Sequence, residues 1–174
     1  MMGVVQMMVF PTAIGDCGIV WNDRGVVGVQ LPEANAEETR QRLQRHWPGT
    51  TTAEPTRAAD RAITGISALL AGEADPMDDV VIDLDGVSDF RRGVYEIART
   101  VGPGETITYG EIASRLGEPH AAREVGQALG ANPVPLIVPC HRVLAAGGKL
   151  GGFSARGGVT TKSRLLAIEG ASLF

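Results

Sequence analysis

Three prolines, at positions 133, 135 and 139, constrain the backbone around the apolar run Leu136-Ile137-Val138. Because a proline ring fixes φ and favours extended conformations, this run is predicted to be a buried strand or another extended segment. It leads directly to Cys140-His141-Arg142. The chain is therefore expected to hold a thiol in an ordered loop, beside an imidazole and a guanidinium.

The neighbours of Cys140 suit a nucleophile. Only the thiolate attacks, and nearby positive groups such as His141 and Arg142 stabilise it. The alternative is a buried structural cysteine, because free cysteine is among the most buried residue types. Two adjacent titratable or charged side chains do not suit an inert core thiol, so we predict a functional site at Cys140.

Length and composition are those of an ordinary soluble protein. The 174 residues suit one or two domains and can bury a core without disulfides or metal. Cys17 and Cys140 are the only cysteines, so a reducing cytoplasm is expected rather than a disulfide framework. Residues 1–10 are apolar, but they lack a basic flank and are too short to span a membrane, which predicts a first strand and no membrane contact.

The charge is divided unevenly along the chain. Residues 1–90 hold 6 Lys and Arg against 14 Asp and Glu, a net charge of −8, whereas residues 91–174 hold 10 against 6, a net charge of +4. The net charge of −4 argues against indiscriminate nucleic-acid binding. The split suggests that the C-terminal half contacts a polyanion, with solubility patterning as the alternative.

The first half of the chain carries strand and helix signals. Two β-branched runs, 19–21 and 26–31, flank Asn22-Asp23-Arg24-Gly25, which predicts a hairpin. Amphipathic patterns predict helices over 33–47 and 56–71, followed by a strand over 80–84. An acidic stretch with a glycine at 85–88 indicates a linker and gives two expected domains, 1–86 and 87–174.

The second half is mainly helical in pattern. Thr108 can cap a short helix, and a turn at Gly117-Glu118-Pro119 separates it from the next one. Two short helices joined by a tight turn are typical of a helix-turn-helix. The four expected helices run from Ser88 or Asp89 to about 101, and over 109–116, 120–131 and about 160–169.

The helix-turn-helix pattern, the motif Pro139-Cys140-His141-Arg142-Val143 and the run LLAIEG at 165–170 occur together in one known family. The chain closely resembles the O6-alkylguanine-DNA alkyltransferases, which repair alkylated guanine by moving the alkyl group onto their own cysteine. The resemblance is dense from about 90 to 170 and weak over 1–85. It implies a two-domain α/β (α+β) fold, with an N-terminal ribonuclease-H-like domain of sheet and helices and a mainly helical, winged-helix-like C-terminal domain.

The resemblance also implies catalytic roles. Cys140 is expected to accept the alkyl group, His141 to draw its proton through a bound water, and Glu169 to orient His141. Tyr109 is expected to donate a hydrogen bond to the leaving guanine oxygen, and Asn132 to brace the loop before the cysteine. The residues alone favour a solvated helix end for Glu169 and a core aromatic for Tyr109, and a routine turn residue is the alternative for Asn132.

The same resemblance implies how DNA is bound. Arg123 matches an arginine that fills the gap left by the extruded base, although a surface ion pair is the alternative. Ala122 and Gly126 fit a recognition helix that enters the minor groove, where small residues permit close approach. Glu124 departs from the small neutral residue expected there, and phosphates repel a carboxylate.

Four further residues are implied at the base pocket. The carbonyl of Val143 would receive the guanine amine, and Ser154 would lie in the loop that closes the pocket. Phe153 stands where the family often has tyrosine and keeps the apolar wall, while Lys162 aligns with a lysine near the pocket. Gly147-Gly148 and Gly151-Gly152 match a tight, short-stranded hairpin that leads to this loop.

No metal or other cofactor is expected. Some family members bind a structural zinc, but only Cys17 and His46 are candidates here, fewer than the four ligands such a site uses. The expected partner is double-stranded DNA containing alkylated guanine, bound by a monomer through its minor groove. The expected location is the cytoplasm, in association with the nucleoid.

The implied function is DNA repair by direct reversal. One molecule would take one methyl or larger alkyl group from guanine O6, and less readily from thymine O4, onto Cys140. A non-catalytic alkyltransferase-like sensor of damaged DNA is the main alternative, but that class has another residue where the cysteine stands. A multiple-turnover cysteine hydrolase would use Cys140 and His141, and a plain helix-turn-helix regulator would leave this motif unexplained.

Overall fold

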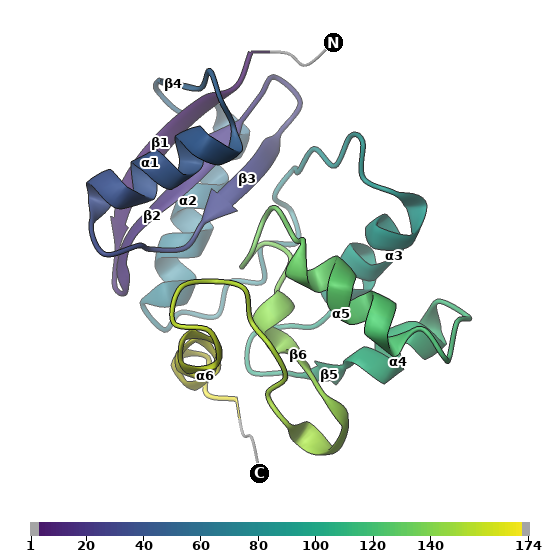
Figure 1. Ribbon diagram of the computed structural model, residues 1–174. Helices are drawn as coiled ribbons and strands as arrows, with labels where there is room; N and C mark the ends of the chain where they lie inside the picture. Colours follow the sequence, from purple (N-terminus) through teal and green to yellow (C-terminus); the bar gives the residue numbers. More distant parts are fainter. Residues whose placement is uncertain (1–3, 172–174) are drawn as a thin grey trace. The chain divides into compact units, whose positions relative to one another are not determined.

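The computed structural model of the protein describes residues 4–171. Within them the chain forms a mixed α/β fold with six α-helices, a four-stranded sheet and a two-stranded sheet (Figure 1). It divides into two compact units, one of Met1–Leu84 with Pro133–Ile137 and one of Asp85–Asn132 with Val138–Phe174. The return of Pro133–Ile137 to the first unit differs from the expected division at 86/87. Its cause is local, because the edge-strand amide of Val29 donates a 2.9 Å hydrogen bond to the Pro133 carbonyl.

The sheet of the first unit is built around a β-meander. Strands β1 (Gln6–Thr12), β2 (Gly15–Trp21) and β3 (Val26–Gln30) pair antiparallel, and the short β4 (Thr51–Thr52) pairs parallel with β1. The predicted hairpin between β2 and β3 is confirmed. Asn22 forms its turn by accepting hydrogen bonds from the amides of Arg24 and Gly25 at 2.8 and 3.1 Å.

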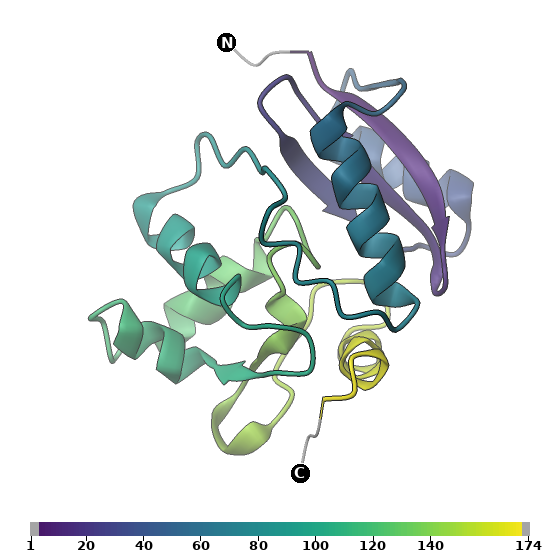
Figure 2. The same ribbon diagram turned by 180° about the vertical axis from the view of Figure 1, so that it is seen from behind.

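Two helices cover opposite faces of this sheet, as Figures 1 and 2 show. Helix α1 (Ala36–His46) is capped by Asn35 and helix α2 (Arg57–Leu70) by Thr56. Because both faces are covered, residues 17–21 of β2 are buried without alternation. Gly18 lets α1 approach closely, since a Cβ at this position would overlap Leu43.

The strand predicted over 80–84 is not formed. A single parallel bridge joins Ile82 to Val26, and Val81 is 54% exposed. The acidic residues beside it bind side chains elsewhere on the first unit: Asp79 pairs with Arg61 at 2.9 Å. The segment meets the sheet edge at one point, where the amide of Val26 donates to the Val81 carbonyl at 3.0 Å and the amide of Asp83 donates to the Val26 carbonyl at 2.8 Å.

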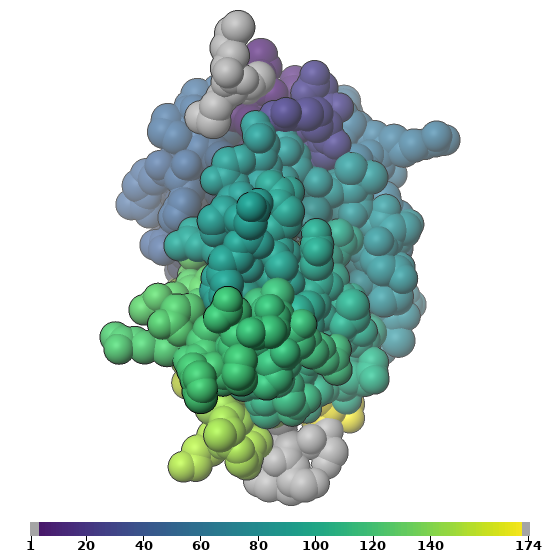
Figure 3. All heavy atoms as spheres, turned by 90° about the vertical axis from the view of Figure 1, so that its right-hand side faces the viewer, coloured from purple at the N-terminus to yellow at the C-terminus, as the bar shows by residue number. Residues whose placement is uncertain are grey.

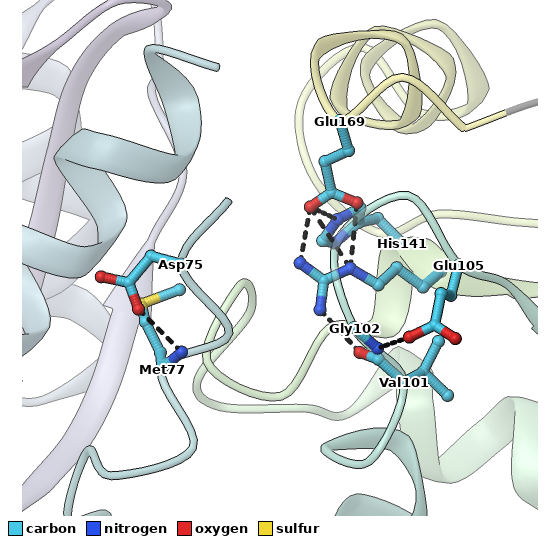
Figure 4. Close-up of polar contacts among 8 residues, drawn as sticks. Asp75, Met77, Val101, Gly102, Glu105, His141 and Glu169 are labelled. Atoms are coloured by element: carbon cyan, nitrogen blue, oxygen red, sulfur yellow. Dashed lines mark hydrogen bonds and ion pairs between the residues drawn. The ribbon is translucent and has the colours of Figure 1, made fainter. Parts of the chain in front are cut away.

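A turn at Asp75 precedes this segment. The Asp75 carboxylate accepts a 3.0 Å hydrogen bond from the amide of Met77, whose backbone adopts a φ of 53° (Figure 4). Arg61 of α2 donates to both oxygens of the same carboxylate at 2.9 and 3.0 Å. Residues 71–80 are thereby fastened to α2.

Four helices dominate the second unit. They are α3 (Asp89–Ala98), α4 (Tyr109–Arg115), α5 (Ala122–Gly130) and α6 (Val159–Ile168). Thr108 caps α4 as predicted, and Ser88 caps α3, which ends at Ala98 rather than near 101. The Tyr95 hydroxyl on α3 donates a 2.6 Å hydrogen bond to the Ala128 carbonyl on α5. The side chains of the α4–α5 region, green in the space-filling view, reach the surface (Figure 3).

The chain around the cysteine is more curved than predicted. Leu136 has a φ of 75°, and Cys140–Arg142 form a single 3₁₀ turn. Leu136, Ile137 and Val138 are all buried, which an extended segment with alternating side chains does not achieve when only one of its faces is covered. After this turn, strand β6 (Val143–Leu144) pairs parallel with β5 (Ile107–Thr108).

The glycine-rich segment after β6 is also a turn rather than the expected hairpin of short strands. Residues Ala146–Gly148 form a 3₁₀ turn, and the amide of Ala145 donates to the Lys149 carbonyl at 2.7 Å. Gly147 and Gly148 have φ values of 74° and 77°, which side chains rarely adopt.

Candidate active site

Cys140 opens the 3₁₀ turn and lies at a pocket of about 490 Å³ in the second unit. Its residue surface is only 9% exposed. Six residues predicted at the DNA or base site line the pocket with it: Tyr109, Ala122, Arg123, Gly126, Phe153 and Ser154. The thiol therefore faces the space where these side chains meet.

Three pocket residues were not predicted. Leu129, Gly130 and Gly152 complete the lining. Leu129 and Gly130 follow Gly126 by three and four residues on α5, so helical periodicity would have placed them on the same face. Gly152 was expected only in the glycine-rich hairpin that leads to the pocket loop, and its place next to Phe153 was the one further signal.

His141 and Glu169 form a buried pair outside the pocket lining. The Nε2 atom of His141 lies 3.0 Å from Oε2 of Glu169, and their side chains are 1% and 2% exposed (Figure 4). The ring's other nitrogen, Nδ1, is buried without a hydrogen-bond partner among the described residues. A proton on Nε2 suits the carboxylate, which leaves the Nδ1 lone pair available as a base.

Arg142 does not serve the thiol as the sequence suggested. Its Nε and Nη2 atoms donate to the Glu169 carboxylate at 2.9 and 2.6 Å, and Nη1 donates to the Val101 carbonyl at 2.8 Å. Residues two apart in a 3₁₀ turn, as Cys140 and Arg142 are, point about 120° away from each other, so closeness in sequence did not bring the guanidinium to the sulfur.

Burial sets the protonation states of the site. It raises the pKa of Cys140, although a hydrogen bond with Asn132 and the charge of Lys162 act in the opposite direction. Burial also lowers the pKa of His141, against the effect of Glu169. Burial alone would raise the pKa of Glu169, but hydrogen bonds from Arg142 and His141 outweigh it and lower the pKa to about 2. The resting pair is a neutral thiol and a neutral imidazole.

Asn132 braces the turn that presents the cysteine. Its Nδ2 atom donates a 2.8 Å hydrogen bond to the Val138 carbonyl. This contact joins Asn132 to the segment that lies just before Cys140.

Lys162 is a buried cation next to the pocket. Its ammonium donates to the Val143 carbonyl at 2.7 Å, to the Gly152 carbonyl at 3.3 Å and to the Tyr109 hydroxyl at 3.4 Å. Burial lowers the pKa of Lys162 to about 8 and, together with the nearby Cys140, raises the pKa of Tyr109. Because Lys162 donates to the tyrosine oxygen, the phenol proton remains free to be donated into the pocket.

The N-terminal turn of α5 combines the exposed Arg123 with the exposed Glu124. No ion pair involves Arg123 within residues 4–171. Ala121 gives the helix no side-chain cap. The rim of the pocket therefore offers one unpaired guanidinium.

Residues 4–171 offer neither a metal-binding cluster nor a membrane-spanning helix. No group of three or more His, Cys, Asp or Glu side chains in the described part of the chain could hold a metal ion. Cys17 is buried in β2, and His46 lies at the exposed end of α1. Among the described helices, none has the length and apolarity needed to cross a membrane.

Fold and site together define a mixed α/β protein whose helical second unit holds a cysteine at a pocket, with a histidine and a glutamate beside it. Residues 89–171 match the family model described as the DNA-binding domain of 6-O-methylguanine DNA methyltransferase. The chain belongs to the methylated-DNA–protein-cysteine methyltransferase family. A Mycobacterium tuberculosis member is 44% identical over 133 residues, 76% of this chain and 75% of the relative. A Methanothermobacter thermautotrophicus member is 34% identical over 158 residues, 91% and 81% of the two chains.

Solved structures agree with this membership. The crystal structure of Mycobacterium tuberculosis O6-methylguanine methyltransferase has a TM-score of 0.75 and 36% identity, covering 95% of this chain and 93% of the other. The structure of Mycobacterium tuberculosis OGT in complex with DNA has a TM-score of 0.76 and 33% identity, covering 94% and 92%. The O6-methylguanine-DNA methyltransferase of the archaeon Pyrococcus kodakaraensis has a TM-score of 0.70 and 26% identity, covering 97% and 100%.

Proposed function

We propose that the protein repairs DNA by direct reversal, moving a methyl or larger alkyl group from O6 of guanine, and less readily from O4 of thymine, onto Cys140. The observation that carries this proposal is the thiol at the pocket with a buried His141–Glu169 pair beside it. In the reaction the sulfur bonds to the alkyl carbon while the bond from that carbon to O6 breaks. The product is a stable thioether, so each molecule acts once.

Activation of the thiol depends on His141. An ordinary thiol of pKa about 8.5 is a few per cent ionised at pH 7, so complete ionisation would gain at most roughly 30-fold. The raised pKa of Cys140 means that the proton must be removed within the site. His141 takes it at Nδ1 through a water molecule, and Glu169 stabilises the resulting imidazolium.

Positioning supplies more of the rate than ionisation. Orientation of the sulfur against a bound alkyl carbon contributes on the order of 7 kcal/mol or more. Tyr109 donates a hydrogen bond from its phenol to the leaving guanine oxygen, and Lys162 holds the tyrosine oxygen. Ser154 closes the pocket and Phe153 supplies an apolar wall.

Recognition of the base also uses the peptide carbonyl of Val143. This oxygen accepts a hydrogen bond from Lys162 and keeps a second lone pair for the guanine amine. Lys162 therefore holds both a carbonyl and a phenol that contact the base.

The duplex is bound through its minor groove by the helix-turn-helix of α4 and α5. A base inside the duplex must be rotated out at a cost of a few kcal/mol. The small residues Ala122 and Gly126 permit close approach, and Arg123 fills the vacancy because its flat cation stacks on bases. Glu124, on the same turn, weakens binding to the phosphates.

The proposal also covers the fold type of each unit, the oligomeric state and the cellular location. The sheet of the first unit, with helices on both faces, supports a ribonuclease-H-like domain, and the second unit supports a winged-helix-like one. Asn132 braces the loop of the nucleophile. The protein acts as a cytoplasmic monomer associated with the nucleoid.

Transfer of a labelled methyl group tests the proposal. Duplex DNA with labelled O6-methylguanine is mixed in excess with the protein, and label bound to protein is counted. We expect one methyl group per molecule and no further repair. Cys140→Ala should bind the duplex and take up no label, whereas the control Cys17→Ala should match the parent. Tight binding of damaged DNA without transfer by the parent protein would instead identify a damage sensor.

A further inference from the structure

Arg142 is a fully buried charge that the reaction described above does not use. Its side chain is 2% exposed, and it does not line the pocket. A buried charge is costly unless it is paired and hydrogen-bonded. Arg142 satisfies this condition with one carboxylate, that of Glu169, and one carbonyl, that of Val101.

The Glu169 carboxylate is shared between two donors. Its Oε2 atom lies 2.6 Å from Nη2 of Arg142 and 3.0 Å from Nε2 of His141, and Oε1 accepts from Nε of Arg142 at 2.9 Å. The guanidinium contact on both oxygens fixes the plane of the carboxylate, because two donors on one rigid fork leave it little freedom to turn. A fixed Oε2 in turn fixes the orientation of the His141 ring.

Arg142, Glu169 and His141 together carry no net charge only while His141 is neutral. Arg142 carries one positive charge and Glu169 one negative charge, and Lys162 is the other group whose charge acts on the imidazole. Lys162 disfavours a proton on His141, as Arg142 does. Without Arg142, Glu169 would be left as a buried negative charge, and His141 beside it would take up a proton to neutralise it.

We propose that Arg142 is a positioning residue that neutralises and orients Glu169, so that His141 rests as a neutral base with its Nδ1 lone pair free to accept the Cys140 proton. This inference rests on the proposed function for its purpose. Glu169 remains near enough to stabilise the imidazolium once the proton has moved from sulfur to Nδ1, while Arg142 prevents that charge from forming earlier.

Nitrogen NMR of the imidazole rings tests the resting state directly. The chain contains three histidines, and His46 and His120 are exposed, which makes them internal references. In the parent protein His141 should be neutral and protonated on Nε2 from about pH 8 down to a pH below the ordinary histidine pKa. A charged His141 at neutral pH, or a proton on Nδ1, would overturn the proposal without any variant.

Variants separate charge from packing. In Arg142→Met, His141 should titrate at a pH at least about one unit above its parent value. If the methionine variant does not fold, Arg142→Gln replaces it, because glutamine is also neutral and should raise the titration pH of His141 in the same way. Arg142→Lys should keep His141 neutral because it retains the charge. The double variant Arg142→Met/Glu169→Gln should return His141 to the neutral form, because it removes the negative charge as well.

Single-turnover alkyl transfer provides the second readout. Arg142→Met should gain an acid limb in which the rate falls about tenfold for each pH unit below the new His141 pKa, and the double variant should lack this limb. If Arg142 had only a structural role, its replacement would lower the rate by the same factor at every pH. That result would contradict the proposal. If the NMR results hold but the parent transfers no alkyl group, the proposed function fails and the electrostatic role of Arg142 stands.

Discussion

Burial governs the reactivity of Cys140 at the scale of the single residue. Because burial raises the pKa of this thiol, less of it is ionised at neutral pH than in free cysteine. We predict slow alkylation by iodoacetamide at pH 7 and a rate that still rises with pH beyond about pH 9, above the ordinary cysteine value. Cys140→Ser is the control, because it leaves only Cys17, whose pKa burial raises to about 12. A rate that levels off below pH 7 would indicate a resting thiolate.

Glu169 makes the free energy of unfolding depend on pH in the acid range. Its pKa is lowered in the folded protein to about 2, from an ordinary value of 4.5. Because the pKa is lower in the folded state, the charged carboxylate stabilises the fold at every pH above the pKa of the unfolded state. This contribution is lost as the pH falls from about 4.5 toward 2. Glu169→Gln should therefore cost on the order of 3 kcal/mol at pH 7, because it leaves Arg142 buried without its anion.

The difference in unfolding free energy between parent and Glu169→Gln, measured by urea denaturation, should shrink across that acid range. Glu73→Gln, at an exposed position, should change little at any pH. A difference that stays constant from pH 7 to pH 2 would show that the carboxylate is not held in its charged form.

Helix α5 is the element that we propose links DNA binding to base extrusion. Arg123 lies on its first turn, exposed and at the pocket. We predict that Arg123→Ala slows repair of duplex DNA far more than reaction with free O6-benzylguanine, because only the duplex requires a base to be rotated out. Single-turnover rates on both substrates measure this. Equal losses on the two substrates would exclude the proposed wedge.

The loop after β6 must pass close to Tyr109. A Cβ on Gly151 would lie 2.8 Å from the Tyr109 hydroxyl, and the backbone there has a φ of 70°. Gly151→Ala should displace the phenol and slow transfer by roughly tenfold, about 1.4 kcal/mol of lost transition-state stabilisation.

Gly148→Ala is the matched control for this loop, because Gly148 has a similar φ of 77° and open space around a Cβ. It imposes the same backbone strain without touching Tyr109. Equal losses of transfer rate in the two variants would assign the effect to backbone strain alone.

At the scale of the whole molecule, the uneven charge predicts how affinity depends on salt. The C-terminal half carries a net charge of +4 and the N-terminal half −8. A protein that neutralises several phosphates releases counterions, so the logarithm of the binding constant should fall linearly and steeply with the logarithm of salt concentration. Fluorescence anisotropy on duplex DNA measures the slope. A flat response would contradict a phosphate-binding role for the basic half.

Local chemistry made part of the fold predictable from the sequence. Asn22 closes its turn and Thr108 caps its helix through bonds to the next few residues, so both signals could be read directly. The run Leu136-Ile137-Val138 was predicted to be extended, but Leu136 and Ile137 form a turn. All three side chains are buried, and this burial depends on packing against distant residues, which the flanking prolines do not indicate.

The site shows the same limit. The Cys140 motif could be recognised from neighbouring residues. The contact between His141 and Glu169 could not, because it joins residues 28 positions apart in the sequence and forms only in the folded chain. The partner of Arg142 could not be deduced from its closeness in sequence to Cys140, because the 3₁₀ turn points the two side chains in different directions. The roles of the individual pocket residues remain predictions.

Peptide mass spectrometry after reaction with duplex DNA containing O6-methylguanine tests the central claim most directly. The account predicts that the peptide containing Cys140 gains one methyl group in an amount equal to the guanine restored, while the peptide containing Cys17 stays unmodified. Guanine restored without a methyl group on Cys140, or a methyl group found on any other residue, would contradict it.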